Sequence, residues 1–134
     1  MRQFLTFLTS CVLFFDISAQ EIPKNPNAYD LDGNKTGVWT ILYDLDWNVT
    51  EIIDSAKFYR VITYEEGIPK GKVIDYKSSS IKMWEGFLYS DSPEREYSGQ
   101  NTWFFDDGSI LETAYFQDNV LEGENVIYNK TGDI

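Results

Sequence analysis

Two segments early in the chain consist mainly of β-branched and aromatic residues and show no apolar stripe with the 3.6-residue period of a helix. They are residues 37–43, Gly-Val-Trp-Thr-Ile-Leu-Tyr, and residues 57–64, Lys-Phe-Tyr-Arg-Val-Ile-Thr-Tyr. This pattern predicts two strands. Between them, residues 47–56 are compatible with a helical turn that has Thr50 as its N-cap or with a long loop, and the pattern favours the loop.

The second half of the chain repeats itself three times, with unit starts 28 and 24 residues apart. Each unit has a glycine and an aromatic residue five positions later, the last two add a turn glycine, and the first two share a small residue fifteen positions in. This self-similarity indicates a stacked repeat. The repeat-defining residues are Gly71, Tyr76 and Gly86, then Gly99, Phe104, Gly108 and Ala114, then Gly123, Tyr128 and Gly132.

Turn signals separate the predicted strands. They lie at residues 65–67, 77–80, 106–108 and 129–132, and in all but the second a glycine supplies the positive φ that tight hairpins need. The prediction is an all-β fold, an antiparallel meander of repeated β-hairpins that forms an elongated, twisted, single-layer sheet. No helix longer than about ten residues is expected after Gln20, because it would show a 3.6-residue period.

Five short motifs in order, at consistent spacing, resemble the MORN-repeat-variant proteins of Bacteroidetes-type bacteria, the repeat class to which YwqK-type antitoxin annotations are attached. The motifs are residues 30–39, 59–64, 71–76, 84–86 and 103–108, and the similarity covers residues 28–134. The resemblance implies a single-layer antiparallel sheet and no established catalytic residues. The chain departs from the pattern at Ser80, where a turn glycine is usual, and at Ile134, where the last unit stops before its return strand.

The first 19 residues have the features of a secretory signal peptide. Arg2 precedes an apolar run, and Ala19 stands at the expected cleavage site. We therefore expect a periplasmic or secreted protein. Residues 20–134 are expected to form one repeat domain, with a divergent first unit near residues 33–37. A minor alternative is a lipoprotein anchored through Cys11, although the apolar run continues beyond that cysteine. No transmembrane anchor is expected.

Charge and composition exclude several functions. Twenty-two acidic against eleven basic residues give a net charge of −11, which would repel nucleic-acid phosphates, so no nucleic acid is expected as a partner. The chain has no histidine, which excludes Ser-His-Asp triads and zinc-histidine sites. We predict no catalytic residues, no metal and no cofactor. Asp30, Asp32 and Asn34 imitate the start of an EF-hand loop, but Lys35 and Ile41 stand where glycine and glutamate are required, so a polar turn is expected.

The aromatic residues suggest two faces of a sheet. Tyr76, Phe104 and Tyr128 are expected at equivalent places on one face. A second set could form either a packed layer or an exposed recognition strip. This candidate binding face consists of Trp39, Trp84, Trp103 and Phe105. A single-layer sheet is expected to offer no concave pocket.

Two function classes follow. The first is a secreted, non-enzymatic repeat module for protein-protein interaction or scaffolding at the bacterial envelope, through strand addition or homodimer edge pairing at the unpaired C-terminal edge near residues 126–134. The alternative is a cell-surface carbohydrate-binding module in which Trp39, Trp84 and Trp103 stack on a glycan. Coplanar, exposed tryptophans would favour the glycan, and buried or dispersed ones a protein partner.

Overall fold

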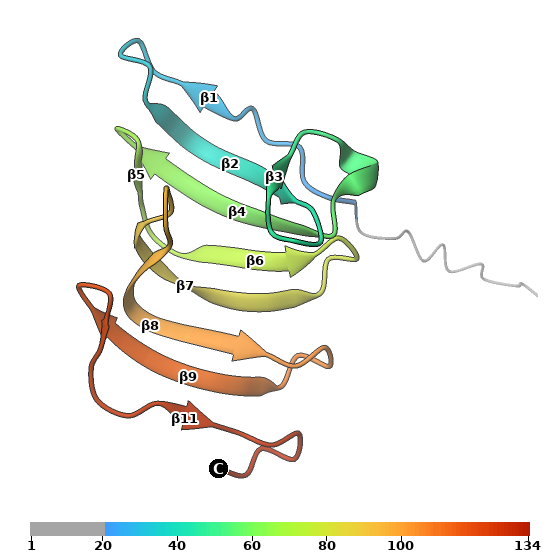
Figure 1. Cartoon of the computed structure of the whole chain (residues 1–134), viewed down its shortest axis with the longest axis vertical. Coiled ribbons are helices and arrows are strands. Elements are labelled where there is room, and N and C mark those ends of the chain that lie inside the picture. Colours follow the sequence, from blue (N-terminus) through green and yellow to red (C-terminus); the bar gives the residue numbers. More distant parts are fainter. Residues whose placement is uncertain (1–20) are drawn as a thin grey trace, which may run out of the picture.

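Residues 21–134, the part of the chain that the computed structural model describes, fold into strands joined by turns and loops (Figure 1). The expected signal peptide, Cys11 and the lipoprotein alternative lie outside the described residues. The one helical element in the described part is a single 3-10 turn, η1 (Ile53–Ser55). The strands are β1 (Ala28–Tyr29), β2 (Lys35–Tyr43), β3 (Val49–Thr50), β4 (Phe58–Glu65), β5 (Ile68–Pro69), β6 (Val73–Lys77), β7 (Lys82–Ser90), β8 (Glu96–Phe104), β9 (Ile110–Gln117), β10 (Val120–Leu121) and β11 (Val126–Ile127).

The described strands make one open antiparallel sheet in the order β1-β2-β4-β6-β7-β8-β9-β10. The short strands β3, β5 and β11 pair with β2, β4 and β9. Apart from the short strands β3, β5 and β11, strands that are neighbours in the sheet also follow one another along the chain, so the topology is a meander. The prediction of an all-β meander of hairpins is confirmed, and turns occur at all four predicted places.

The first turn is stabilised by a carboxylate that accepts backbone N–H groups. Asp30 Oδ1 accepts the N–H groups of Asp32 and Asn34, both at 2.9 Å. The bond from Asn34 is the main cause that holds the pKa of Asp30 below its usual value. This is an Asx-type turn that leads into β2. The prediction of a polar turn here is confirmed.

The segment at residues 47–56 contains both a loop and a helical turn, the two alternatives that its sequence left open. It is mainly loop, with the two-residue strand β3 and the single turn η1. Thr50 is not the N-cap of η1, because that position is held by Ile52, which makes no side-chain cap bond. Thr50 Oγ1 instead accepts the Ile52 N–H at 3.1 Å, ahead of the helical turn.

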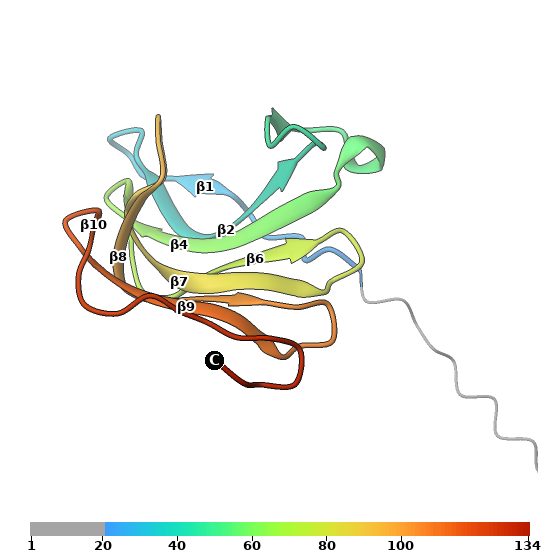
Figure 2. The same ribbon diagram turned by 60° about the horizontal axis from the view of Figure 1, so that its bottom comes forward.

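The register of the strands assigns side chains to two faces. Ile41 lies opposite Arg60, Arg60 opposite Asp75, and Asp75 opposite Trp84, so these four side chains share one face. We call it the inner face and the other the outer face. The strands bow so that the inner face is concave, and the β2–β3 hairpin and the segment before β8 rise on its two sides (Figure 2).

The hydrophobic core lies on the inner face. A single sheet has no second layer to pack against, and here the concave side is filled by its own large side chains. The buried members are Trp39, Ile41, Ile62, Tyr64, Val73, Trp84 and Leu88, and Tyr43, Tyr97 and Trp103 pack against them.

The repeat aromatics within strands lie on the outer face. The outer face can be followed across five strands by cross-strand pairs, in the order Ile74, Glu85, Thr102, Thr113 and Val126. Two residues further along β6 and β8 come the aromatics Tyr76 and Phe104, and Tyr128 follows β11 two residues after Val126. The prediction of a shared face is confirmed for Tyr76 and Phe104, which lie within strands. All three are only half-buried, so they are not the core of the molecule.

The N-terminal edge of the sheet is covered by a side chain. The Asn27 amide donates to the Thr40 carbonyl and accepts the Thr40 N–H, both at 2.9 Å. Asn27 thus takes the place of a neighbouring strand at the middle of β2, between the short pairings with β1 and β3. Such cover protects an edge from pairing with another chain.

Candidate functional site

A buried ion pair crosses the middle of the inner face. Arg60 Nε and Nη2 donate to the two carboxylate oxygens of Asp75 at 2.7 and 2.8 Å, and the side chains are 2% and 1% exposed. Burial opposes the charge of Arg60, but the hydrogen bonds and negative charge of Asp75 outweigh it and raise the pKa of Arg60 above its ordinary value. The guanidinium stays charged and is fixed in one orientation.

Arg95 joins the pair from the segment that connects β7 and β8. Its Nη2 lies 3.2 Å from Asp75 Oδ2. The guanidinium carbon lies 5.3 Å from the ring centroid of Trp84, 5.6 Å from that of Trp47 and 5.9 Å from that of Tyr97. Contacts of this kind with aromatic rings stabilise a cation. The three rings therefore hold Arg95 against the inner face.

The same β7–β8 segment is joined to the inner face at a second point. The Tyr64 hydroxyl donates to Asp91 Oδ2. Burial, followed by this bond and the negative charge of Asp91, raises the pKa of Tyr64. Burial is also the main cause that raises the pKa of Tyr43, which lies next to Arg60. Both phenols are neutral donors at ordinary pH.

Trp47 occupies a backbone position that suits glycine. The turn at Asp44 repeats the one at Asp30, with Asp44 Oδ1 accepting the N–H groups of Asp46 and Asn48 at 2.9 Å. In the first turn the fourth residue is Gly33, with φ +82°, and in the second it is Trp47, with φ +64°. The Trp47 ring stacks on Phe58 at a centroid distance of 4.4 Å. A bulky residue in this strained conformation points to a functional role for its side chain.

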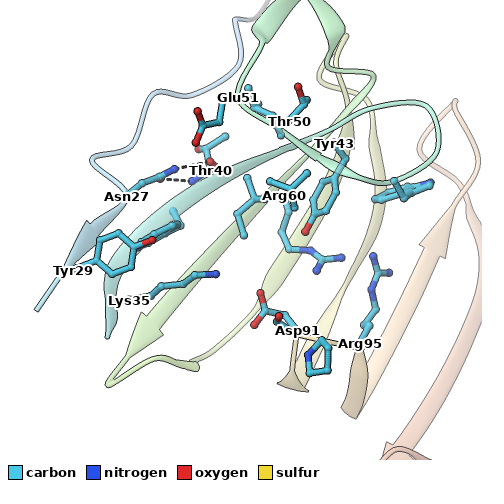
Figure 3. Close-up of a pocket in the computed structure, with 17 residues that line it drawn as sticks. Asn27, Tyr29, Lys35, Thr40, Tyr43, Thr50, Glu51, Arg60, Asp91 and Arg95 are labelled. Carbon is cyan, nitrogen blue, oxygen red and sulfur yellow. Dashed lines mark hydrogen bonds between the residues drawn. The ribbon is translucent and has the colours of Figure 1, made fainter. Parts of the chain in front are cut away.

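A cavity of about 740 Å³ on the inner face, which we call the groove, is lined by Tyr43, Trp47, Arg60, Asp91 and Arg95 (Figure 3). Its walls are the edge of β1 and β2, the β2–β3 hairpin and the β7–β8 segment. The expectation that a single-layer sheet offers no concave pocket is wrong, because curvature and two long connections enclose space that a flat sheet would leave open. Tyr29 and Lys35 also line the groove.

The structure does not present the candidate binding face as an exposed strip. Trp39 and Trp84 are 7% and 2% exposed and belong to the core, and Trp103 is half-buried against it. Phe105 lies beyond the end of β8, half-buried, with Lys130 Nζ 5.8 Å from its ring centroid. The expectation of a recognition strip is thus wrong for Trp39 and Trp84, because the concave face needs these rings to fill it. The packed-layer alternative describes them correctly.

Two carboxylates at the groove are held by hydrogen-bond donors. Both oxygens of Asp75 accept bonds from Arg60, and Asp91 accepts the Tyr64 hydroxyl, so the two acids are engaged by donors. A carboxylate in such bonds is a poor general base. Among residues 21–134, no group of three or more Cys, Asp or Glu side chains is placed to hold a metal ion. The groove is lined by cationic, aromatic and amide groups as well as by Asp91 and Glu51.

The charged groups of the groove were not among the site residues predicted from the sequence. A signal was present, since Arg60 and Asp75 each interrupt a strand that is otherwise mainly apolar or aromatic. An isolated charge in such a strand is expected to find a partner when it is buried. The sequence around Lys35 and Arg95 gives no comparable indication that these two residues line the groove. Their positions depend on how the turn before β2 and the β7–β8 segment fold.

The C-terminal edge is shorter than the sequence indicated. β11 pairs with β9 through Val126 and Ile127 only. The Tyr128 N–H donates to the Leu111 carbonyl at 2.8 Å, so by alternation the N–H of Ile127 points away from the sheet. Beyond it, the chain turns again at Asn129, whose N–H donates to the Asp133 carbonyl. Ile127 therefore supplies the outward N–H of this edge.

The fold is a curved, open β-meander with a groove on its concave face. No protein-family model matches the chain, and comparisons with curated proteins and with solved structures find no match. The resemblance to MORN-repeat-variant proteins stays a prediction. None of the helical structure in residues 21–134 is long and apolar enough to cross a membrane.

Proposed function

We propose that this chain is a non-enzymatic module that binds another protein in the groove on its inner face, at or outside the bacterial envelope. The observation that carries the proposal is Trp47, a large ring 38% exposed in the groove from a left-handed backbone position that is glycine in the matching turn at Asp30. Exposed aromatic side chains on a rigid support are the usual anchors of protein interfaces. MORN-like repeats and secretion through residues 1–19 belong to the same proposal.

A protein partner fits the groove better than a glycan. Stacking on a sugar chain needs several coplanar, exposed rings, and Trp39 and Trp84 are buried. The exposed rings, Tyr29 and Trp47, come from opposite ends of β2, one before it and one after it. Rings that are dispersed in this way suit the separate side chains of a polypeptide.

The groove is also a better candidate than the C-terminal edge. Strand addition takes its affinity from a row of main-chain hydrogen bonds. The outer side of β11 presents the N–H of Ile127 before the chain turns. We therefore place the main contact in the groove and keep strand addition and edge-paired dimers as outcomes of the test.

The test is capture of envelope proteins on the immobilised chain, followed by binding measurements with the purified partner. Trp47→Asn removes the ring and keeps a residue that tolerates the left-handed backbone. We expect this variant to lose the partner. Tyr115→Ala, which removes an exposed ring from the outer face, is the matched control and should retain it.

Two results would contradict the proposed site. If Ile127→Pro abolishes binding while Trp47→Asn leaves it intact, the contact is the C-terminal edge. If the chain retains oligosaccharides and no protein, and Trp47→Asn releases them, the glycan alternative replaces the protein partner. The melting temperature of each variant is measured alongside, so that loss of the fold is recognised.

A further inference from the structure

Lys35 is a half-buried cation with no carboxylate partner among residues 21–134. Its Nζ lies 5.0 Å from the ring centroid of Trp39 and 4.8 Å from that of Tyr64. Its hydrogen bond in the described structure is a long donation, 3.5 Å, to the Tyr64 hydroxyl. In a chain with twice as many acidic as basic residues, a lysine placed in this way retains donors for a ligand.

Arg95 retains donors at the other side of the same groove. It makes two long contacts, 3.2 Å to Asp75 and 3.4 Å to the Tyr97 hydroxyl. A guanidinium has five N–H donors, so more than half of them stay available. The side chain is 27% exposed, and the guanidinium carbon lies between 5.3 and 5.9 Å from three ring centroids. A planar guanidinium matches the geometry of a carboxylate ligand.

The negative groups of the groove do not satisfy these cations. Asp75 is fully buried and shared with Arg60, and Asp91, between Lys35 and Arg60 in Figure 3, accepts the Tyr64 hydroxyl. Glu51 is exposed at the rim. Neither Asp91 nor Glu51 makes an ion pair with Lys35 or Arg95 in the described structure. The floor of the groove therefore offers two cationic positions that can each receive a carboxylate.

We propose that the groove binds an extended acidic segment of a partner protein, with one carboxylate on Lys35 and a second on Arg95. The inference rests on the proposed function and adds the chemistry of the partner. Apolar side chains that flank the acidic residues contact the exposed rings of Tyr29 and Trp47. In an extended segment, side chains two positions apart point the same way, so alternate residues can enter the groove together.

The overall charge limits the ligand to a short acidic segment. The net charge of −11 repels a polyanion at a distance, while the two cations act only within a few ångströms of the groove. A segment with two carboxylates carries too little charge to be strongly repelled at a distance, and each carboxylate can reach one of the two cations. A nucleic acid or a long acidic polysaccharide brings many uncompensated charges toward the acidic surface.

The experiment uses synthetic peptides of about eight residues in which two aspartates alternate with variable residues and apolar residues flank them. Matched peptides carry asparagine in place of aspartate. Binding to the full chain is measured by fluorescence anisotropy. We expect the aspartate set to contain binders whose asparagine counterparts bind much more weakly. Lys35→Gln and Arg95→Gln should each reduce affinity roughly tenfold to a hundredfold, the loss expected for a charge-assisted hydrogen bond.

Lys82→Gln is the matched control, because it removes the same charge from the outer face, where Lys82 pairs with Glu85. Its affinity should be unchanged. Since Arg95 also supports Asp75, Lys35→Gln decides the result if Arg95→Gln lowers the melting temperature.

Equal binding of aspartate and asparagine peptides, or no loss in Lys35→Gln, would overturn the carboxylate assignment. The proposed protein-binding function would then still stand if Trp47→Asn abolishes partner capture. Absence of any bound peptide would overturn the acidic-segment proposal. If oligogalacturonate binds instead and Lys35→Gln abolishes that binding, the partner is an acidic glycan and both proposals fail.

Discussion

Gly86 has to be small because two buried side chains occupy the space that a Cβ would need. A methyl group there would lie 2.1 Å from Asn101 Oδ1 and 2.8 Å from Trp84 Cζ2. The Asn101 oxygen and the Trp84 indole nitrogen are also buried without a hydrogen-bond partner in the described structure. The two side chains are therefore packed tightly around Gly86. This explains why the repeat has a small residue here and Ala114 at the equivalent place, where the side chain is 2% exposed.

Gly86→Ala should lower the free energy of unfolding by about 1–3 kcal/mol, the usual cost of overpacking. Gly123→Ala tests the other reason for a glycine, because its Cβ would meet no atom within 4 Å but its φ is +82°. It should cost about 1 kcal/mol through backbone strain. Urea denaturation compares the two variants. A Gly86→Ala protein as stable as the native chain would contradict the crowding.

Removing one partner of the Arg60–Asp75 pair should lower the free energy of unfolding more than replacing both partners with apolar residues. Asp75→Asn leaves the buried Arg60 charge without its counter-charge, and we expect a loss of about 3–5 kcal/mol in the free energy of unfolding. The double variant Arg60→Met, Asp75→Leu removes both charges and should be more stable than Asp75→Asn alone. Both are measured by urea denaturation. A double variant less stable than the single one would contradict this account.

Tyr64 should make stability depend on alkaline pH. Its pKa is raised in the folded protein above the unfolded value of 10.0, so the folded state keeps the proton that the unfolded state loses. This contribution is complete below about pH 10 and is lost as pH rises beyond it. Between about pH 8 and pH 11, the free energy of unfolding should therefore fall less in Tyr64→Phe than in the native chain. Parallel falls would contradict the shift.

At the scale of the element, the inner face of the long strands is more deeply buried than most of the outer face. Phe104, on the outer face, is half-buried, whereas Trp84 on the inner face is 2% exposed. Phe104→Ala should therefore cost about 1–2 kcal/mol, in proportion to the smaller area that it buries, and Trp84→Ala about 3–5 kcal/mol. Thermal and urea denaturation measure both. Equal losses would mean that the outer-face aromatics also hold the repeats together.

The elements that could be predicted from the sequence are those that local chemistry determines. β2 and β4 follow from their β-branched and aromatic content, and the hairpins follow from turn residues such as Asp107 and Gly108. The groove could not be predicted, because it depends on the bow of the sheet and on two connections whose shape is set by distant contacts. Arg95 reaches its place through Asp75 and Trp84, which precede it by 20 and 11 residues.

At the scale of the whole molecule, stability should be concentrated in the middle of the sheet. β4 and β6 contain Tyr59, Ile62 and Val73, each at most 2% exposed, whereas β10 and β11 at the C-terminal side carry mostly exposed residues. Amide hydrogen exchange should therefore be slowest in β4 and β6 and fast in β10 and β11. Uniform protection would show instead that the sheet opens as one cooperative unit.

The meander has a mechanical consequence. The described chain enters the sheet at the β1 edge and leaves it at the β11 edge, with the strands between them in order (Figure 1). Tension applied across the two edges would therefore load the outermost hairpins first and peel them from the sheet, opening backbone hydrogen bonds a few at a time. A protein held between two anchors in this way would yield gradually, and the groove, which is built mainly on β2 and its neighbours, would be distorted as soon as the β1 side peels.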